Sequence, residues 1–180
     1  MRGRIGAMDD EVHAERLDAA EEGIELLRDG ETERAIAALG RLAVAQADNE
    51  YAHFFLGNAH YAAESFERAL ACYVRALELA PRYLGARVGA GHALRMLGDH
   101  ERALRMGKEA LALAKDDPDA LYLVGVVLFQ RGDNAAARAF LKRFLETGPE
   151  LEVALEVEGM LQVIRGEIAP AHGGEEDDAE

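Results

Sequence analysis

The chain has one cysteine and no long hydrophobic run, and both absences narrow what it can be. A single cysteine, Cys72, excludes an internal disulfide and any zinc site built from several cysteines. The longest apolar run, residues 121–129, has nine residues, about half of the roughly 18 that a membrane span needs. The first seven residues contain no apolar stretch typical of a secretory signal. We therefore expect a protein of the reducing cytoplasm without membrane insertion.

Positive charge is also scarce, since 20 Lys and Arg face 34 Asp and Glu, a net charge of −14 in 180 residues. Nucleic acids and anionic membranes are poor partners for such a chain. The charge is uneven: residues 1–33 carry −7, residues 34–166 carry −1 and residues 167–180 carry −6. We expect a disordered acidic tail over residues 167–180, because this segment cannot bury enough apolar area to become ordered. We also expect a flexible segment over residues 1–9, since Met8 resembles a second possible start.

The strongest pattern in the sequence is a repeat of 34 residues. Four columns of small residues recur at this step, and Glu64 is the one departure from the third of them. They are Gly23, Gly57, Gly91, Gly125 and Gly159; Ala35, Ala69, Ala103 and Ala137; Gly30, Gly98, Gly132 and Gly166; and Ala52, Ala86, Ala120 and Ala154. A periodic sequence of this length predicts a stack of similar structural units.

Each period predicts two helices, for example residues 50–63 and 66–80 in the second copy, with apolar residues at helical spacing. Glycines such as Gly98 and Gly132 mark the turns inside a period, and Pro81, Pro118 and Pro149 lie between periods. Because helices approach closely only where side chains are small, we expect each glycine of the first column to face an alanine on its partner helix.

These residues resemble the tetratricopeptide (TPR) repeat, whose pattern is a Leu-Gly pair, an alanine, aromatic residues and a closing proline. The second copy matches best, through Leu56-Gly57, Ala69, Tyr73 and Pro81. The resemblance implies an all-α solenoid over residues 10–166, with repeats at about 16–49, 50–83, 84–117 and 118–151. A capping helix is expected over residues 151–165.

In a TPR array the first helix of each repeat lines a concave groove, and here these helices carry apolar residues beyond one packing stripe. An exposed apolar stripe is typical of a binding site, although neighbouring helices or the tail could cover it instead. The predicted peptide-binding residues are Leu17, Ile24, Leu27, Tyr51, Phe54, Phe55, Asn58, Tyr61, Val88, His92, Arg95, Tyr122, Val126 and Phe129.

Two features of the third repeat are unusual. His92 and Arg95 lie one turn apart and, with Asn58 and Tyr61, form the one polar cluster of the predicted groove. They could anchor a ligand carboxylate or backbone carbonyl, or they could be ordinary surface residues. Gly85 and Gly89 lie inside a helix without a packing reason visible in the sequence, and we expect them to let a ligand backbone come close.

The sequence contains no motif for catalysis, a metal or a cofactor. Histidines such as His53 and His60 are expected to pack, and Cys72 is expected to be a buried, inert thiol. We therefore predict a non-catalytic module without cofactor or metal that binds another protein through an apolar peptide or helix.

The family resemblance implies several kinds of partner. Many TPR adaptors hold the C-terminal carboxylate of Hsp70 or Hsp90 with basic and amide side chains. The corresponding positions here include Phe54, Gly85, Gly89 and Asp119, which disfavours that ligand. The chain is generally similar to small bacterial TPR chaperones of secretion systems, which hold an apolar segment of a client. The alternative is a structural or scaffolding subunit of a larger assembly.

Overall fold

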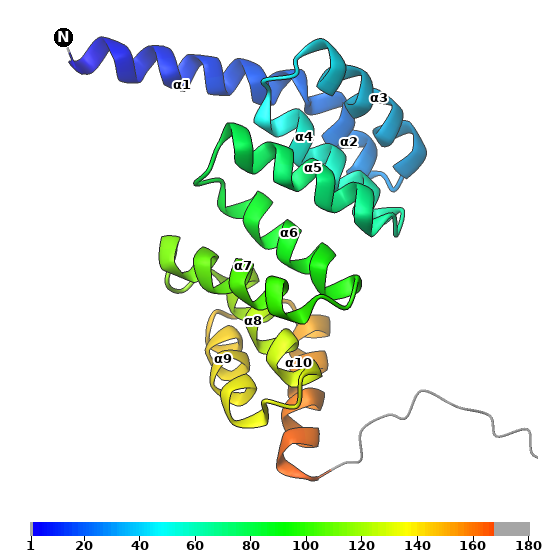
Figure 1. The fold of residues 1–180 in the computed structure, drawn as a ribbon, viewed down its shortest axis with the longest axis vertical. Helices are drawn as coiled ribbons and strands as arrows, with labels where there is room; N and C mark the ends of the chain where they lie inside the picture. The colour runs from blue at the N-terminus through cyan, green and yellow to red at the C-terminus, as the bar shows by residue number, and fades with distance from the viewer. Residues whose placement is uncertain (1, 168–180) are drawn as a thin grey trace, which may run out of the picture.

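The computed structural model describes residues 2–167, with side chains from residue 11 onward, and this range contains ten α-helices and no strand. Successive helices form antiparallel pairs that stack into one elongated array (Figure 1). The helices are α1 (Arg2–Ala19), α2 (Glu21–Arg28), α3 (Thr32–Ala45), α4 (Glu50–Ala62), α5 (Phe66–Leu79), α6 (Leu84–Met96), α7 (His100–Leu113), α8 (Pro118–Gln130), α9 (Asn134–Glu146) and α10 (Leu151–Arg165). The predicted all-α solenoid of four helix pairs and a final helix is confirmed.

Side-chain caps and left-handed residues set the helix boundaries. At the start of α4, Oδ1 of Asn49 accepts hydrogen bonds from the backbone N–H groups of Tyr51 and Ala52 at 3.0 and 3.2 Å. At the helix ends, the glycine column has φ between 74° and 79° at Gly30, Gly98, Gly132 and Gly166. The same conformation, φ 54°, occurs at Glu64, the departure from that column. The turn geometry therefore repeats even where the glycine that suits it is missing.

At Gly23, Gly57 and Gly125 of the first glycine column, the atoms nearest to an added Cβ belong to a large side chain of the partner helix, where the sequence predicted an alanine. A Cβ added to Gly57 would lie 2.7 Å from Cε1 of Tyr73, and one added to Gly125 would lie 2.5 Å from Cδ2 of Leu141. The alanine column that includes Ala69 is completely buried. Gly23, Gly57 and Gly125 thus each make room for one bulky residue of their partner helix, whereas Gly91 makes room for Leu123 of the next pair.

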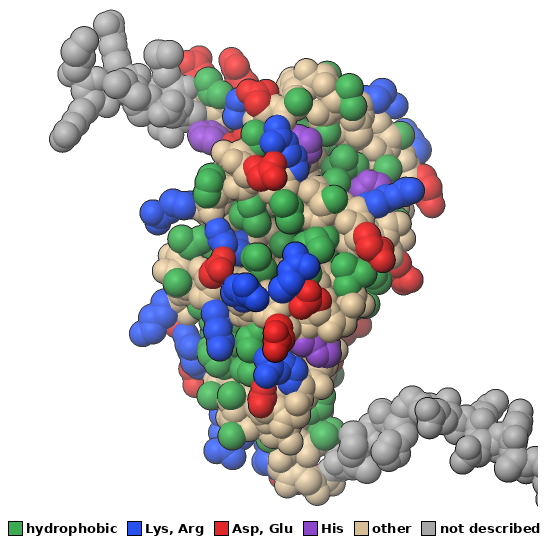
Figure 2. Space-filling model, in the orientation of Figure 1, with side chains coloured by type: hydrophobic (Ala, Val, Ile, Leu, Met, Phe, Trp, Pro, Cys, Tyr) green, Lys and Arg blue, Asp and Glu red, His purple; other side chains and the backbone are tan. Residues whose placement is uncertain are grey.

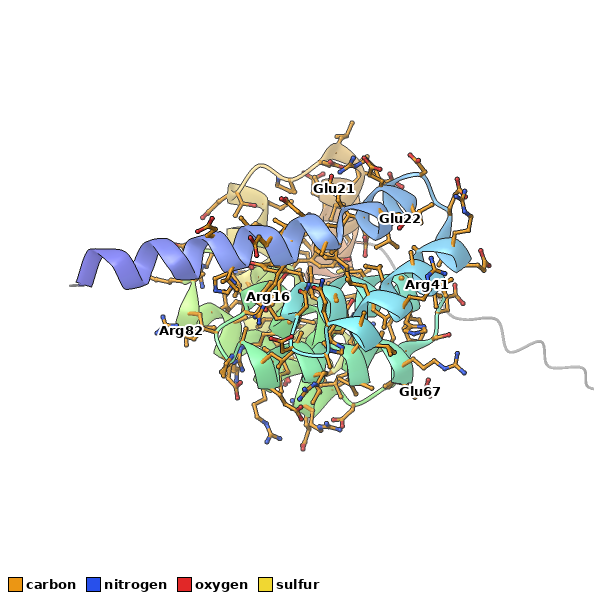
Figure 3. All side chains as sticks on the ribbon, turned by 90° about the horizontal axis from the view of Figure 1, so that it is seen from above. Arg16, Glu21, Glu22, Arg41, Glu67 and Arg82 are labelled. Atoms are coloured by element: carbon orange, nitrogen blue, oxygen red, sulfur yellow. The ribbon has the colours of Figure 1, made fainter. Side chains whose placement is uncertain are left out.

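At the N-terminal end, α1 reaches back to Arg2, although the sequence predicted a flexible segment over residues 1–9. This helix projects beyond the array (Figure 1). Its second half is attached to the start of α4, because Arg16 pairs with Asp48 and, at 2.9 Å, with Glu50, which is 3% exposed. Figure 3 shows Arg16 beneath α1, on the side of the other helices. A buried carboxylate with a cation beside it fixes where the two helices meet.

Charged side chains of both signs alternate over the face of the array drawn in Figure 2, with hydrophobic side chains between them. This mixture agrees with the near-neutral charge of residues 34–166. At the C-terminal end, Gly166 closes α10 and Glu167 pairs with Arg165 at 2.7 Å. The rest of the segment that was expected to be an acidic tail, residues 168–180, lies outside the described residues.

Candidate binding groove

A hollow of about 450 Å³ lies between helices of the second, third and fourth pairs. The residues that line it come mainly from α4, α6 and α8, the first helices of their pairs, and one comes from α5. They are Phe54, Asn58, Tyr61, Tyr73, Gly85, Val88, Gly89, His92, Arg95, Asp119 and Tyr122. We call this site the central hollow.

Aromatic rings form one wall of the central hollow. Phe54 packs against Tyr83 with ring centroids 4.8 Å apart and against Tyr73 at 6.0 Å. Tyr122, which also lines the hollow, contacts the ring of His92 at 5.9 Å and that of Phe144 at 5.3 Å. These contacts hold the rings in place, so the hollow presents rigid apolar surface at little entropic cost to a ligand.

Gly85 and Gly89 have a packing role that the sequence did not reveal. A Cβ at Gly89 would lie 2.7 Å from Cε1 of Tyr73, and a Cβ at Gly85 would lie 3.1 Å from Cζ of Phe54. Both glycines therefore make room for rings of the preceding helix pair. Because those rings occupy the space, the expectation that a ligand backbone approaches these glycines is corrected, although both still line the hollow.

The four polar residues singled out in the sequence, Asn58, Tyr61, His92 and Arg95, all line the central hollow. Oδ1 of Asn58 accepts a hydrogen bond from the Tyr73 hydroxyl at 2.8 Å. The Nε atom of Arg95 is buried and has no hydrogen-bond partner among the described residues. The hollow thus contains an amide held in place and a guanidinium group that no carboxylate of the described chain holds.

Burial changes the acid–base properties of the groups around Arg95. Burial and the Arg95 charge lower the pKa of His92 to about 4, so this imidazole is neutral at pH 7. Burial and the neighbouring Asp117 raise the pKa of the Asp119 carboxyl. Burial and a hydrogen bond to Glu156 raise the pKa of Tyr122 to about 12. Arg95 is consequently the residue that brings positive charge into the hollow at neutral pH.

A second hollow of about 560 Å³ continues the groove toward the C-terminal helix. It shares His92, Asp119 and Tyr122 with the central hollow. Its other lining residues come from α8, α9, α10 and the loop between the last two, and include Pro118, Phe144, Thr147, Gly148, Pro149, Glu150, Val153 and Glu156. We call this site the C-terminal hollow; the three shared residues join the two hollows into one groove.

The other predicted groove residues lie outside both hollows. Ile24, Leu27, Tyr51 and Phe55 pack around a separate core cluster of the first helix pairs, and Leu17 is 37% exposed on α1. Val126 is only 3% exposed and Phe129 packs against the same core cluster as Val126. Val126 is therefore an interior residue, like its neighbours Gly125, Val127 and Leu128 on α8, which are also buried.

Sequence reasoning did not propose Tyr73, Asp119 or the residues of the C-terminal hollow as ligand-binding residues. Asp119 lies one turn before Tyr122, so its place on the same helix face was readable from the spacing. Tyr73 was expected to pack, and it does, at 3% exposure, while its edge reaches the hollow. The C-terminal hollow depends on how α10 packs against α8 and α9, which the spacing within one helix does not describe.

Three further observations limit the chemistry of the described residues. No group of three or more His, Cys, Asp or Glu side chains in that part of the chain is arranged to hold a metal ion. Burial raises the pKa of the Cys72 thiol, which disfavours a reactive thiolate. Within residues 2–167, no helix is long and apolar enough to cross a membrane.

Family models of the tetratricopeptide repeat match residues 50–83 and 88–152, together more than half of the chain. The chain belongs to the tetratricopeptide repeat family. No curated protein matches its sequence.

Solved TPR structures share the fold at low sequence identity. A thermophilic TPR protein of Thermus thermophilus is 21% identical with a TM-score of 0.71, over 86% of this chain and 83% of that one. MamA is 20% identical with a TM-score of 0.68, over 87% and 84%. The second TPR domain of the human RPAP3 protein, in complex with an HSP70 peptide, is 21% identical with a TM-score of 0.59, over 64% and 97%.

Proposed function

We propose that the chain is a non-catalytic protein-binding module whose groove holds an apolar-anchored peptide or helix. The observation that carries this proposal is the central hollow, where Phe54, Tyr61 and Tyr122 surround about 450 Å³ of open volume beside Arg95. A concave site with fixed aromatic walls and few polar groups is typical of ligand recognition. The volume is suited to one or two large side chains of a partner.

The chemistry of the groove supports binding and not catalysis. The described residues that line the two hollows include no serine, cysteine or lysine that could act as a nucleophile. His92, the histidine shared by both, has a pKa lowered to about 4 and is too weak a base to serve at pH 7. Tyr122, another shared residue, donates its hydroxyl hydrogen bond to Glu156 and has a pKa raised to about 12, which disfavours its ionisation at pH 7.

The groove also favours one class of peptide over another. The human RPAP3 domain holds an HSP70 peptide that ends in Glu-Val-Asp. In this chain, Gly85 and Gly89 offer no basic side chain and Asp119 adds a negative charge to the hollow. A cluster of carboxylates at a peptide terminus would be repelled there, whereas apolar anchors would be accepted. A chaperone that shields an apolar client segment fits this preference.

A structural or scaffolding subunit is the second candidate, and it rests on α10. Leu151 and Leu155 on this helix are 75% and 58% exposed, and a Cβ at Gly159 would meet no atom of the described chain within 4 Å. In the preceding copies the same glycine column packs against a second helix. The outer face of α10 is thus free to stack against a further protein.

The groove proposal can be tested by truncating its aromatic walls. Peptides selected on the full chain from a displayed library of random 12-residue sequences serve as probes, and fluorescence polarisation gives the Kd. We expect Tyr61→Ala and Tyr122→Ala to weaken binding by roughly 1–4 kcal/mol, as aromatic anchors do. Val74→Ala, an apolar truncation at a 40%-exposed site on α5 that lines neither hollow, should leave the Kd unchanged.

Circular dichroism of each variant establishes that the helices remain folded. Equal affinities for the two tyrosine variants and Val74→Ala would refute the groove as the binding site. The scaffold alternative predicts instead that Leu151→Asp with Leu155→Asp removes the chain from a stable multi-subunit complex in its native lysate, while peptide affinity is unaltered.

A further inference from the structure

Four arginines of the described side chains are half-buried, and three of them are paired with carboxylates. Arg16 holds Asp48 and Glu50, Arg87 holds Glu109, and Arg143 holds Asp116 at 2.8 Å. Arg95 is the fourth, and no carboxylate of the described residues lies within ion-pair distance of it. Because a half-buried charge is less well solvated than an exposed one, an unpaired guanidinium in such a place is costly unless a partner arrives.

The immediate surroundings do not neutralise this charge. Asp119 lines the same hollow but forms no ion pair with Arg95, and the charge that acts on its carboxyl is the neighbouring Asp117. His92 is neutral at pH 7, so it adds no second positive charge beside Arg95 and does not neutralise the charge of Arg95. Oδ1 of Asn58 already accepts a hydrogen bond from the Tyr73 hydroxyl. The amide nitrogen of Asn58 and the guanidinium of Arg95 therefore both remain to donate to an acceptor.

The electrostatics at longer range limit how many acids that acceptor can bring. The whole chain carries a net charge of −14, and the C-terminal hollow is lined by Asp119, Glu150 and Glu156. A peptide with several acidic residues would be repelled before it reached Arg95. A segment of neutral or positive net charge is not repelled by the acidic chain at a distance. One acidic residue within that segment can still pair with Arg95, because this attraction acts at short range.

We infer that Arg95 selects the ligand by binding one aspartate or glutamate side chain, which lies beside an apolar anchor in a segment of neutral or positive net charge. The inference rests on the proposed function and specifies its ligand. The guanidinium fork suits a carboxylate because two parallel N–H···O bonds form at once. The apolar neighbour of the acid occupies the space between Phe54 and Tyr122.

The inference is tested by selecting peptides on two forms of the full chain. A displayed library of random 12-residue peptides is panned on the natural chain and on Arg95→Gln, and enriched sequences are synthesised with amidated C-termini. We expect Asp or Glu next to an aromatic or aliphatic residue to be enriched on the natural chain and not on Arg95→Gln. Replacing that acid by its amide should weaken binding to the natural chain about tenfold or more, and binding to Arg95→Gln less than about twofold.

Two matched variants separate the role of Arg95 from a general effect of charge. Arg105→Gln removes an exposed arginine of α7 that lines neither hollow, and it should behave like the natural chain. Arg95→Lys keeps the charge but loses the fork, so its affinity for the acidic peptide should be intermediate. Because Arg95 has no partner to lose in the described chain, Arg95→Gln should fold normally, which circular dichroism and thermal melting verify.

Each remaining outcome is decisive. If acidic peptides are enriched equally on Arg95→Gln, or if none is enriched on the natural chain while binding still depends on Tyr122, the inference is wrong and the proposed function stands. If no peptide binding depends on Tyr61 or Tyr122, the proposed function fails and the inference fails with it. If binding requires a free C-terminal carboxylate in place of the amide, the groove recognises a chain terminus and not an acidic side chain.

Discussion

The hydroxyl of Tyr73 on α5 donates a hydrogen bond to Oδ1 of Asn58 on α4 across 2.8 Å. The ring of Tyr73 lies between Gly57 and Gly89, and a Cβ at either glycine would lie 2.7 Å from its Cε1. One buried side chain thus joins three helices of the array and orients the amide that faces the groove. The packing of the interior and the shape of the central hollow depend on the same residue.

Removing the hydroxyl alone should measure what this bond contributes. We expect Tyr73→Phe to lower the free energy of unfolding by about 0.5–1.5 kcal/mol in urea denaturation, because the ring still fills the space between the glycines. Tyr61→Phe is the control, since the Tyr61 hydroxyl forms no hydrogen bond within the described residues. Equal midpoints of urea unfolding for the two variants would mean that the hydrogen bond from Tyr73 to Asn58 adds no net stability.

The glycine column offers a second, internally controlled prediction. Gly125→Ala places a methyl group 2.5 Å from Cδ2 of Leu141, and we expect it to destabilise the chain by about 1–3 kcal/mol. Gly159→Ala belongs to the same column but meets no atom of residues 2–167 within 4 Å, so it should be neutral or should stabilise α10 by about 0.5–1 kcal/mol. Thermal melting of both variants checks the contrast; a stable Gly125→Ala would contradict the packing described above.

The left-handed turn at Glu64 predicts a stabilising substitution. With φ 54°, this glutamate adopts the backbone conformation that glycine adopts at Gly98 and Gly132. Glu64→Gly should raise the free energy of unfolding by about 0.5–1 kcal/mol, because glycine has no Cβ to crowd the following carbonyl. Gly132→Ala, the converse change, should lower it by a similar amount. If both changes destabilise, side-chain contacts of Glu64 outweigh its backbone strain.

His92 predicts a loss of stability in mild acid. Its pKa is about 4 in the folded chain and near its ordinary value of 6.5 in the unfolded chain, so between these values the unfolded state binds the extra proton. The contribution of His92 to the free energy of unfolding is therefore complete above about pH 6.5, and it is lost as the pH falls toward 4. Between pH 7.5 and pH 5 we expect a loss of about 1–2 kcal/mol from this group.

The measurement compares urea unfolding at the two pH values for the natural chain and for His92→Gln, which cannot titrate. Because other groups titrate in both proteins, the difference between the two losses isolates His92. An identical loss in the two proteins would show that His92 ionises as freely when folded as when unfolded.

Much of the central hollow could be read from the sequence. The 34-residue period and the helical spacing within it placed Phe54, Asn58 and Tyr61 on one face of α4, and His92 and Arg95 on the matching face of α6. The spacing could not show that Val126, on the matching face of α8, is interior at 3% exposure. Exposure of a side chain depends on what the neighbouring helices cover, and a pattern along one helix does not contain that information.

The sequence by itself determined the repeat, and the turns and helix boundaries inside it, because caps, left-handed residues and apolar spacing act over a few neighbouring residues. Only the tertiary structure decided what each glycine faces: Tyr73 beside Gly57 and Gly89, and Leu141 beside Gly125. It also decided that Arg95 has no carboxylate beside it among the described residues, whereas Arg87 has Glu109. The pairing of side chains from different helices depends on the distance and angle between those helices, and these arise from the packing of the whole array.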